Sequence, residues 1–338
     1  MNGTNKGPII KIVALLLAVV LVFVGGYFVF TLIEGNYDGT LGDGSGNFGV
    51  AKRTLDGQTY VYDYDKTLIT FMGIDGEGVV KQGDDYRCGR QADTIFLIAI
   101  DDVKQEVQFL QIDRDTICGV QSYGDFSAGD IVQEQIALAY AYGKEGHHAS
   151  RNVIKSLSAL IGLPTKAIEN YFVVAMDGID PFVSACGGIE IDIPQDKDYT
   201  WLDASYVGGA TVRLTGEKAY KFIHERLDGD DGRNRSRMER HKILIPALMD
   251  ALAIELSSFS VVTDSKWDTT LEYADTIMDN LELLSIANQI KNYTLKPVIT
   301  ATGRLEEPAD PEDPASFYVD ADDLNRLIIE LCFKKEGA

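Results

Sequence analysis

The stretch RQADTIFLIAIDDVKQEVQFLQIDRDT, residues 90–116, decides how this sequence folds. Residues 95–100 and 107–112 are apolar runs rich in residues that favour β-strands. The mostly polar segment between them, residues 101–105, is too short for anything but a hairpin turn. The sequence therefore predicts two neighbouring antiparallel strands at this place.

Charged side chains gather at the open end of the predicted hairpin. The turn folds Asp93 back beside Arg114 and Asp115. Charged strand ends that only contact water are common, and this is the simpler interpretation. The other interpretation is that these side chains bind a charged ligand, because converging charges are typical of functional sites.

Length and charge restrict the classes of partner. The chain has 338 residues, 45% of them hydrophobic, which is enough for a full core, and its formal net charge is −21. Nucleic acids bind proteins of the opposite charge, so this balance argues against a nucleic-acid partner. An anionic ligand would need a local basic cluster.

The N-terminal region predicts a membrane anchor. Residues 12–33 carry no charge and are long enough, as a helix, to cross about 30 Å of hydrocarbon. Lys6 and Lys11 precede this segment and acidic residues follow it. The positive-inside rule then places residues 1–11 in the cytoplasm and the rest outside a cell membrane that the chain crosses once. A cleaved signal peptide is the alternative.

Beyond the membrane segment, the sequence predicts a stalk and one domain. Residues 34–63, with six glycines between positions 35 and 49, are typical of an extracytoplasmic stalk. In residues 64–338, β-rich and helical segments alternate, which predicts an α/β fold: an α-β-α sandwich around a central mixed sheet. Strands are expected at 67–74, 95–100, 107–112, 171–175, 189–193 and 295–302, and helices at 150–161, 181–186, 215–226, from about 236, 274–290 and 321–333.

A second charged region lies between positions 213 and 242, where nine basic residues face six acidic ones. Arg237 shares a helix face with Arg240 and His241, near a helix N-terminus where the backbone dipole also favours anions. We therefore predict an anion-binding site in this region. A solvated helix face with ordinary salt bridges is the alternative.

The cysteines leave their pairing open. The hairpin turn near Val103 would bring Cys88 opposite Cys118, so a disulfide between them is plausible outside the cytoplasm. Cys186 and Cys332 would form a second bridge or remain buried thiols.

Six motifs in order resemble those of one family. They are MGID (72–75), ADT (92–94), IDRDT (112–116), AYAYG (139–143), the run from Tyr171 through ACGGIEIDIP, and LTGEKAY with a later R-x-x-R block. Over about residues 67–248, the chain resembles the LytR-CpsA-Psr family of cell-envelope glycopolymer transferases.

The resemblance implies an α-β-α sandwich with a hydrophobic pocket for a polyprenyl tail. It also implies a Mg²⁺-dependent phosphotransferase that moves an undecaprenyl-diphosphate-linked glycopolymer, such as a teichoic acid or capsular polysaccharide, onto peptidoglycan. Two alternatives remain. One is a non-catalytic scaffold or regulator that binds polyprenyl phosphates, and the other is a pyrophosphatase that uses water as the acceptor.

The resemblance also assigns roles to individual residues. Asp75 and Asp93 match the family's metal-binding aspartates, and Asp115 is expected to orient a neighbouring arginine. Asp93, Arg114 and Asp115 form the expected catalytic group. The expected phosphate-binding residues are Arg90, Arg114, Arg226, Arg237, His224 and His241. Arginine and Mg²⁺ are both suited to the concentrated negative charge of a diphosphate.

Several positions depart from the family pattern. The family's usual residues are replaced by His224 and His241, by Gln91 with Arg90 one step earlier, by Gln135 and Ala137 before AYAYG, and by Asp113 before Arg114. Each histidine has two plausible roles, since it can donate to a phosphate or make an ordinary structural hydrogen bond.

Overall fold

The computed structural model describes residues 52–76, 78, 80, 90–124, 127–143, 147–225, 234–257, 266–308 and 314–337. The predicted cytoplasmic segment and the predicted membrane helix at 12–33 lie outside these ranges. None of the helices within them is both long and apolar enough to cross a membrane. Residues 52–63, which the sequence assigned to the stalk, contain two strands and so belong to the folded unit.

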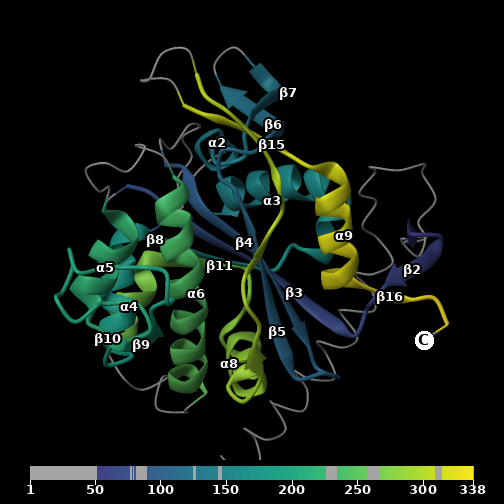
Figure 1. The fold of residues 1–338 in the computed structure, drawn as a ribbon. Coiled ribbons are helices and arrows are strands. Elements are labelled where there is room, and N and C mark those ends of the chain that lie inside the picture. Colours follow the sequence, from purple (N-terminus) through teal and green to yellow (C-terminus); the bar gives the residue numbers. More distant parts are fainter. Residues whose placement is uncertain are drawn as a thin grey trace, which may run out of the picture. The chain divides into compact units, whose positions relative to one another are not determined.

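A mixed seven-stranded sheet forms the centre of the molecule (Figure 1). Its strand order is β11-β8-β3-β4-β5-β12, with β13 also paired to β5. The strands are β3 (Lys66–Ile74), β4 (Ala92–Asp101), β5 (Glu106–Ile112), β8 (Tyr171–Ala175), β11 (Ala274–Thr276), β12 (Thr294–Leu295) and β13 (Ile299–Thr300). β4 pairs antiparallel with both β3 and β5, whereas β8 runs parallel to β3. The predicted hairpin and the mixed sheet are both confirmed.

The β3–β4 pairing contains a bulge that matters for the site. Gly73 pairs with Thr94, but Ile74 pairs with Ala92, so Asp93 is the extra residue between them. A bulge changes the direction in which a side chain points and is common beside active sites. Here it lies at the end of β4 that the sequence identified by its charged residues.

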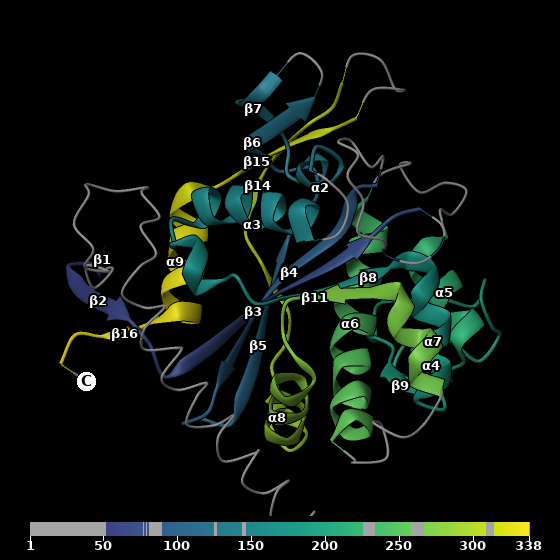
Figure 2. The same cartoon turned by 180° about the vertical axis from the view of Figure 1, so that it is seen from behind.

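Helices cover both faces of the sheet (Figures 1 and 2), which confirms the predicted α-β-α sandwich. One face carries α3 (His147–Ile161) and α9 (Ala321–Cys332), and the other carries α4 (Ile179–Ala185), α5 (Gly216–His224), α6 (Arg235–Leu256) and α8 (Asn280–Ile290). Smaller helical turns are α2 (Leu138–Ala141), α7 (Lys266–Thr270), η1 (Thr165–Ala167), η2 (Met176–Gly178) and η4 (Leu271–Tyr273).

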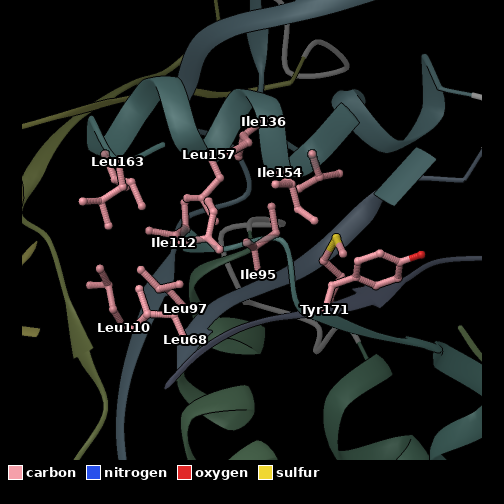
Figure 3. Packing of buried hydrophobic residues seen from close by; sticks show 14 of the residues in the cluster. Leu68, Ile95, Leu97, Leu110, Ile112, Ile136, Ile154, Leu157, Leu163 and Tyr171 are labelled. Atoms are coloured by element: carbon pink, nitrogen blue, oxygen red, sulfur yellow. The ribbon is translucent and has the colours of Figure 1, made fainter. Parts of the chain in front are cut away.

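Strand alternation divides the core into two apolar clusters. Ile95 and Leu97 of β4 face α3, whereas Phe96 and Ile98 between and after them face the other layer. Figure 3 shows the first cluster, in which Ile95 and Leu97 lie on the same side of the sheet as Leu157 of α3. Because β4 is buried on both sides, its sequence is continuously apolar rather than alternating.

Short sheets surround the central one, and the sequence did not predict most of their strands. In one of them, β2 (Gln58–Tyr62) lies between β1 (Lys52–Leu55) and β16 (Phe333–Lys335) and pairs with both. The others are two-stranded and pair β6 (Ile117–Gly124) with β7 (Ser127–Gln135), β9 (Ile189–Asp192) with β10 (Thr211–Leu214), and β14 (Gly303–Glu306) with β15 (Ser316–Val319). Two predictions were wrong in detail. The expected helix 274–290 is β11 followed by α8, and the expected strand 295–302 is two short strands.

The disulfide predictions find no support in the part of the chain that the structure describes. Cys118 is a buried free thiol in β6, where it pairs with Glu134 of β7, and Cys88 lies outside the described residues. Cys332 is also a buried free thiol, so the alternative bridge to Cys186 is not formed. The β4–β5 register ends at Ile112, and the chain turns away before it reaches Cys118.

Candidate anion-binding site

The candidate site lies where β3, β4 and β5 end beside one another. Asp75 follows β3, Asp93 occupies the β4 bulge and Arg114 follows β5. Gln91 links the first two, because its carbonyl accepts hydrogen bonds from the backbone N–H of Asp75 at 3.0 Å and of Asp93 at 3.1 Å. Its own N–H donates to Oδ1 of Asp75. The backbone therefore brings the two predicted metal-binding aspartates to the same edge of the sheet.

Asp93 is held between two arginines. Its side chain is 4% exposed; Oδ1 forms an ion pair with Arg114 Nη1, and Oδ2 accepts from Arg237 Nη1 at 3.0 Å. Burial lowers the pKa of both arginines, and the charge of Arg237 lowers that of Arg114 further. Asp115 pairs with Arg114 as well, at 3.3 Å. In a chain of net charge −21, two buried guanidinium groups thus lie together at one site.

Neighbouring polar groups fix the direction of Arg114. Its Nη2 donates to Oε1 of Gln91 at 2.8 Å, and its Nε donates to Oδ1 of Asp115 at 3.3 Å. The same oxygen of Asp115 accepts from Nε2 of Gln135 at 3.1 Å. Asp115 therefore contacts the arginine that it was expected to orient, and Gln135 supports Asp115.

The N-terminus of α6 supplies the other half of the cluster. Arg237 lies in the first turn of this helix and donates from Nη2 to Oδ1 of Asn234 at 3.2 Å. Asn234 is 7% exposed, and its Nδ2 finds no acceptor within the described ranges. A buried amide donor without a partner is uncommon in folded proteins. Beside two arginines and a helix N-terminus, it suits an anionic ligand.

His241 makes structural hydrogen bonds, which is one of the two roles that the sequence left open. The residue is 1% exposed; Nδ1 is 2.8 Å from Oγ1 of Thr94, and Nε2 lies 3.4 Å from the carbonyl oxygen of Ile223. Burial and then the charge of Arg237 lower the pKa of His241 to about 3. A neutral imidazole with both nitrogens engaged supports the packing of α6 against β4.

Two other predicted phosphate ligands, His224 and Arg90, make their contacts with residues other than Asp93. His224 is exposed at the end of α5, where its ring stacks on Tyr220 with centroids 5.0 Å apart. Arg90 lies along the loop after Asp75 and donates to the carbonyl of Gly78 at 3.4 Å. Arg226 lies outside the described residues.

The carboxylates present fit one kind of metal site. Among the residues that the structure describes, no group of three or more His, Cys, Asp and Glu side chains could enclose a metal. Mg²⁺ does not need such a group, because proteins usually hold it with one or two carboxylates while water and substrate phosphates complete its shell. Asp75 and Asp93 are a donor set of this kind.

Three contributors had weak signals in the sequence. Gln91 and Gln135 stood out only as departures from the family pattern, yet both hold the Arg114–Asp115 pair. Asn234 is a residue type that favours the start of a helix, and it directly precedes α6. Its contact with Arg237, three residues later, follows from helical spacing.

Comparison with known proteins places this site in a family. The model of the LytR_cpsA_psr family matches residues 49–327. The polyisoprenyl-teichoic acid–peptidoglycan teichoic acid transferase TagV of Bacillus subtilis is 25% identical over 268 residues, which are 77% of this chain and 62% of TagV. The corresponding transferase TagU of Enterococcus faecalis is 22% identical over 292 residues, 83% of each chain.

Solved structures show the same fold. The crystal structure of B. subtilis TagV gives a TM-score of 0.57 at 23% identity, covering 80% of this chain and 96% of that one. The structure described as TagT bound to LI-WTA gives 0.58 at 17% identity, covering 79% and 90%. The α/β fold with its central mixed sheet is thus shared, and the family model spans most of the sequence. The chain belongs to the LytR_cpsA_psr family.

Proposed function

We propose that this protein is a membrane-anchored, extracytoplasmic phosphotransferase that depends on Mg²⁺. It would move an undecaprenyl-diphosphate-linked glycopolymer, of the teichoic acid or capsular polysaccharide type, onto peptidoglycan. The observation that carries the proposal is the buried Asp93 between Arg114 and Arg237. The names of TagV and TagU support the substrate class, and the uncharged segment 12–33 supports the anchor.

The reaction consists of one displacement at phosphorus. A hydroxyl oxygen of the acceptor sugar bonds to the phosphorus that carries the glycopolymer, and the phosphoanhydride bond breaks. Polyprenyl monophosphate leaves with the bonding electron pair, and the hydroxyl proton passes to water. Such transfers depend mainly on positioning and on stabilising negative charge, which is what fixed arginines do.

The chain's own residues would act on the diphosphate as follows. Without a ligand, the carboxylate of Asp93 forms ion pairs with the guanidinium groups of Arg114 and Arg237. An incoming diphosphate carries more charge than one carboxylate, so it would take over these contacts and keep both buried cations paired. Gln91 and Asp115 would hold Arg114 in position during the exchange.

Asp75 and the released Asp93 would hold Mg²⁺. Bound there, the metal ion would neutralise charge on the leaving phosphate. Arg90, Arg226 and His224 remain proposed phosphate contacts, and His241 is proposed to position α6 rather than to bind phosphate.

Transfer by the full-length chain in membrane nanodiscs would test the proposal, with a fluorescent lipid-diphosphate glycan as donor and peptidoglycan oligomers as acceptor. We expect Arg114→Ala to lower the transfer rate roughly 100-fold, the usual effect of removing one charge-stabilising donor. Arg326→Ala on α9 is the matched control, because this arginine is exposed and pairs with Asp323 and Glu330 of its own helix.

Each outcome selects one function. Equal transfer by wild type and Arg114→Ala would show that the proposed roles are wrong. Binding of the lipid diphosphate without turnover would identify a scaffold or regulator instead. Release of free glycan phosphate with water as the acceptor would identify a pyrophosphatase.

A further inference from the structure

A groove of about 610 Å³, lined by both charged and apolar residues, lies beside α6 at the edge of the central sheet. We call it the α6 groove, and its lining includes Asp113, Arg235, Glu239, Lys242, Thr300 and Thr302. The volume falls within the roughly 300–1,000 Å³ typical of small-ligand sites. The groove contains neither Arg114 nor Arg237, so it is distinct from the arginine cluster.

The charges of the α6 groove differ from those of the arginine cluster. Two cations, Arg235 and Lys242, are matched by two acids, Asp113 and Glu239, and Lys242 Nζ lies 2.7 Å from Oε1 of Glu239. A second diphosphate would meet two carboxylates here. A lining that combines donors, acceptors and apolar residues such as Phe317 suits sugar rings, which carry hydroxyl groups and also have apolar faces.

An unpaired polar atom of Thr300, which lines the α6 groove, points to such a ligand. Thr300 pairs with Gln111 in the parallel β13–β5 register, so the two lie side by side, but Gln111 itself is not part of the groove lining. Oγ1 of Thr300 and Oε1 of Gln111 are buried and have no hydrogen-bond partner within the described ranges. Gln111 is 2% exposed and uses its Nε2 to donate to the carbonyl of Met238 at 3.2 Å. Buried acceptors of this kind are normally satisfied.

The α6 groove is directly linked to the arginine cluster through the backbone. Asp113 lines the groove, and the next residue, Arg114, contacts Asp93. Likewise, Met238 lines the groove, and the preceding residue, Arg237, contacts Asp93. Adjacent α-carbons are about 3.8 Å apart. A ligand in the groove would therefore lie next to the groups that are proposed to hold the diphosphate.

We propose that the α6 groove binds the acceptor, a hydroxyl-rich glycan strand of peptidoglycan, and presents its hydroxyl to the diphosphate. Asp113 and Glu239 accept hydrogen bonds from glycan hydroxyls, and Lys242 donates to glycan oxygens. This inference rests on the proposed function, because it assigns the second substrate of that reaction.

Transfer kinetics with the full-length chain test the inference by varying donor and acceptor separately. We expect Lys242→Met and Glu239→Gln each to raise the KM for uncrosslinked glycan strands about tenfold, since each removes a charged hydrogen-bonding group. The KM for the lipid-diphosphate donor should not change. Lys166→Met is the matched control, because Lys166 forms a pair with Glu169 at the same three-residue spacing and the same 2.7 Å distance, away from the groove.

The result that would overturn the inference is an acceptor KM equal to wild type in both folded variants, or an equal rise in the donor KM. Thermal unfolding of each variant identifies loss of folding, and Glu239→Gln retains the size of the side chain. If the wild type transfers nothing, the proposed function fails, and calorimetric titration with glycan strands still decides about the groove. Weaker binding by Lys242→Met would support it, and unchanged binding would exclude it.

Discussion

The two ends of the β4–β5 hairpin carry the same kind of charge cluster in different surroundings. At the closed end, Asp101 lies 3.8 Å from Lys66 and 3.5 Å from Lys104, and the Lys104 side chain is 64% exposed. At the open end, Asp93 lies between Arg114 and Arg237, and none of these three side chains is more than 14% exposed. Both clusters join carboxylates to basic side chains, and at the open end Asp115 also pairs with Arg114.

The difference shows that burial and geometry, rather than composition, identify a candidate site. Lys104 at the closed end is exposed, so its ion pair with Asp101 contributes little. The Lys66 side chain is largely buried there, and besides lying near Asp101 it donates to the carbonyl of Leu331 at 2.9 Å. Burial raises the pKa of Asp101, but the backbone N–H of Lys104 and the charges of the two lysines lower it more, so this pKa lies below its usual value. At the open end, two planar guanidinium groups are buried together beside Asp93 and Asp115, so they offer fixed donors to an anionic ligand.

The largest expected effect comes from removing the carboxylate at each end. Asp93→Asn removes the carboxylate that both buried arginines contact, so we expect a loss of about 3–5 kcal/mol in the free energy of unfolding. Transfer should fall roughly 100-fold. Asp101→Asn should cost about 1 kcal/mol and leave transfer unchanged. Urea denaturation and transfer assays measure both, and equal costs at the two ends would contradict the comparison.

Replacing guanidinium by ammonium gives the next effect. Arg237→Lys keeps the charge but loses the fork that reaches Asp93 and Asn234 together, so we expect transfer to fall about 10- to 100-fold. Lys104→Arg at the closed end should have no measurable effect. Transfer rates measured over a range of lipid-diphosphate donor concentrations test both variants. A wild-type rate in Arg237→Lys would mean that a positive charge at this position is sufficient for transfer.

The third prediction concerns pH. The pKa of His241 is about 3 in the folded chain, whereas histidine in an unfolded chain titrates near 6.5. Between these values only the unfolded chain binds the proton, so stability falls as the pH drops, by on the order of 2 kcal/mol between pH 7 and pH 5. His241→Gln should remove this loss, and exposed His148→Gln should not. Denaturation curves at pH 7 and pH 5 measure the loss of stability in wild type, His241→Gln and His148→Gln. An equal loss in all three proteins would show that His241 is not the group responsible.

The smallest effect is expected in the turn at the closed end. Gln105 adopts φ of +54°, a left-handed conformation that favours glycine. Gln105→Gly should therefore stabilise the chain by up to about 1 kcal/mol, without any change in transfer. Thermal unfolding measures the gain, and a destabilised variant would show that the side chain or the stiffer unfolded chain matters more.

Local features of the sequence predicted the hairpin and one of its contacts. Residues 95–100 and 107–112 pair nearly as the turn implied, and this places Asp93 beside Arg114. The observed turn, residues 102–105, is one residue shorter than expected, and so short a turn fixes the register of its strands, so local information is nearly sufficient. The same reasoning was wrong for Cys118, because the pairing ends at Ile112 and the chain enters another hairpin.

Only the tertiary structure decided what completes the arginine cluster. Arg237 is 144 residues from Asp93, and its contact depends on how α6 packs on the sheet. The bulge at Asp93, the pairing of β11 with β8 and the α6 groove likewise join segments that are distant in sequence. Partners of strands and helices far apart in the chain are selected by packing rather than by local preference. The sequence by itself therefore determined the family motifs, the longer strands of the central sheet and the main helices, while long-range packing determined the short sheets and which charges meet.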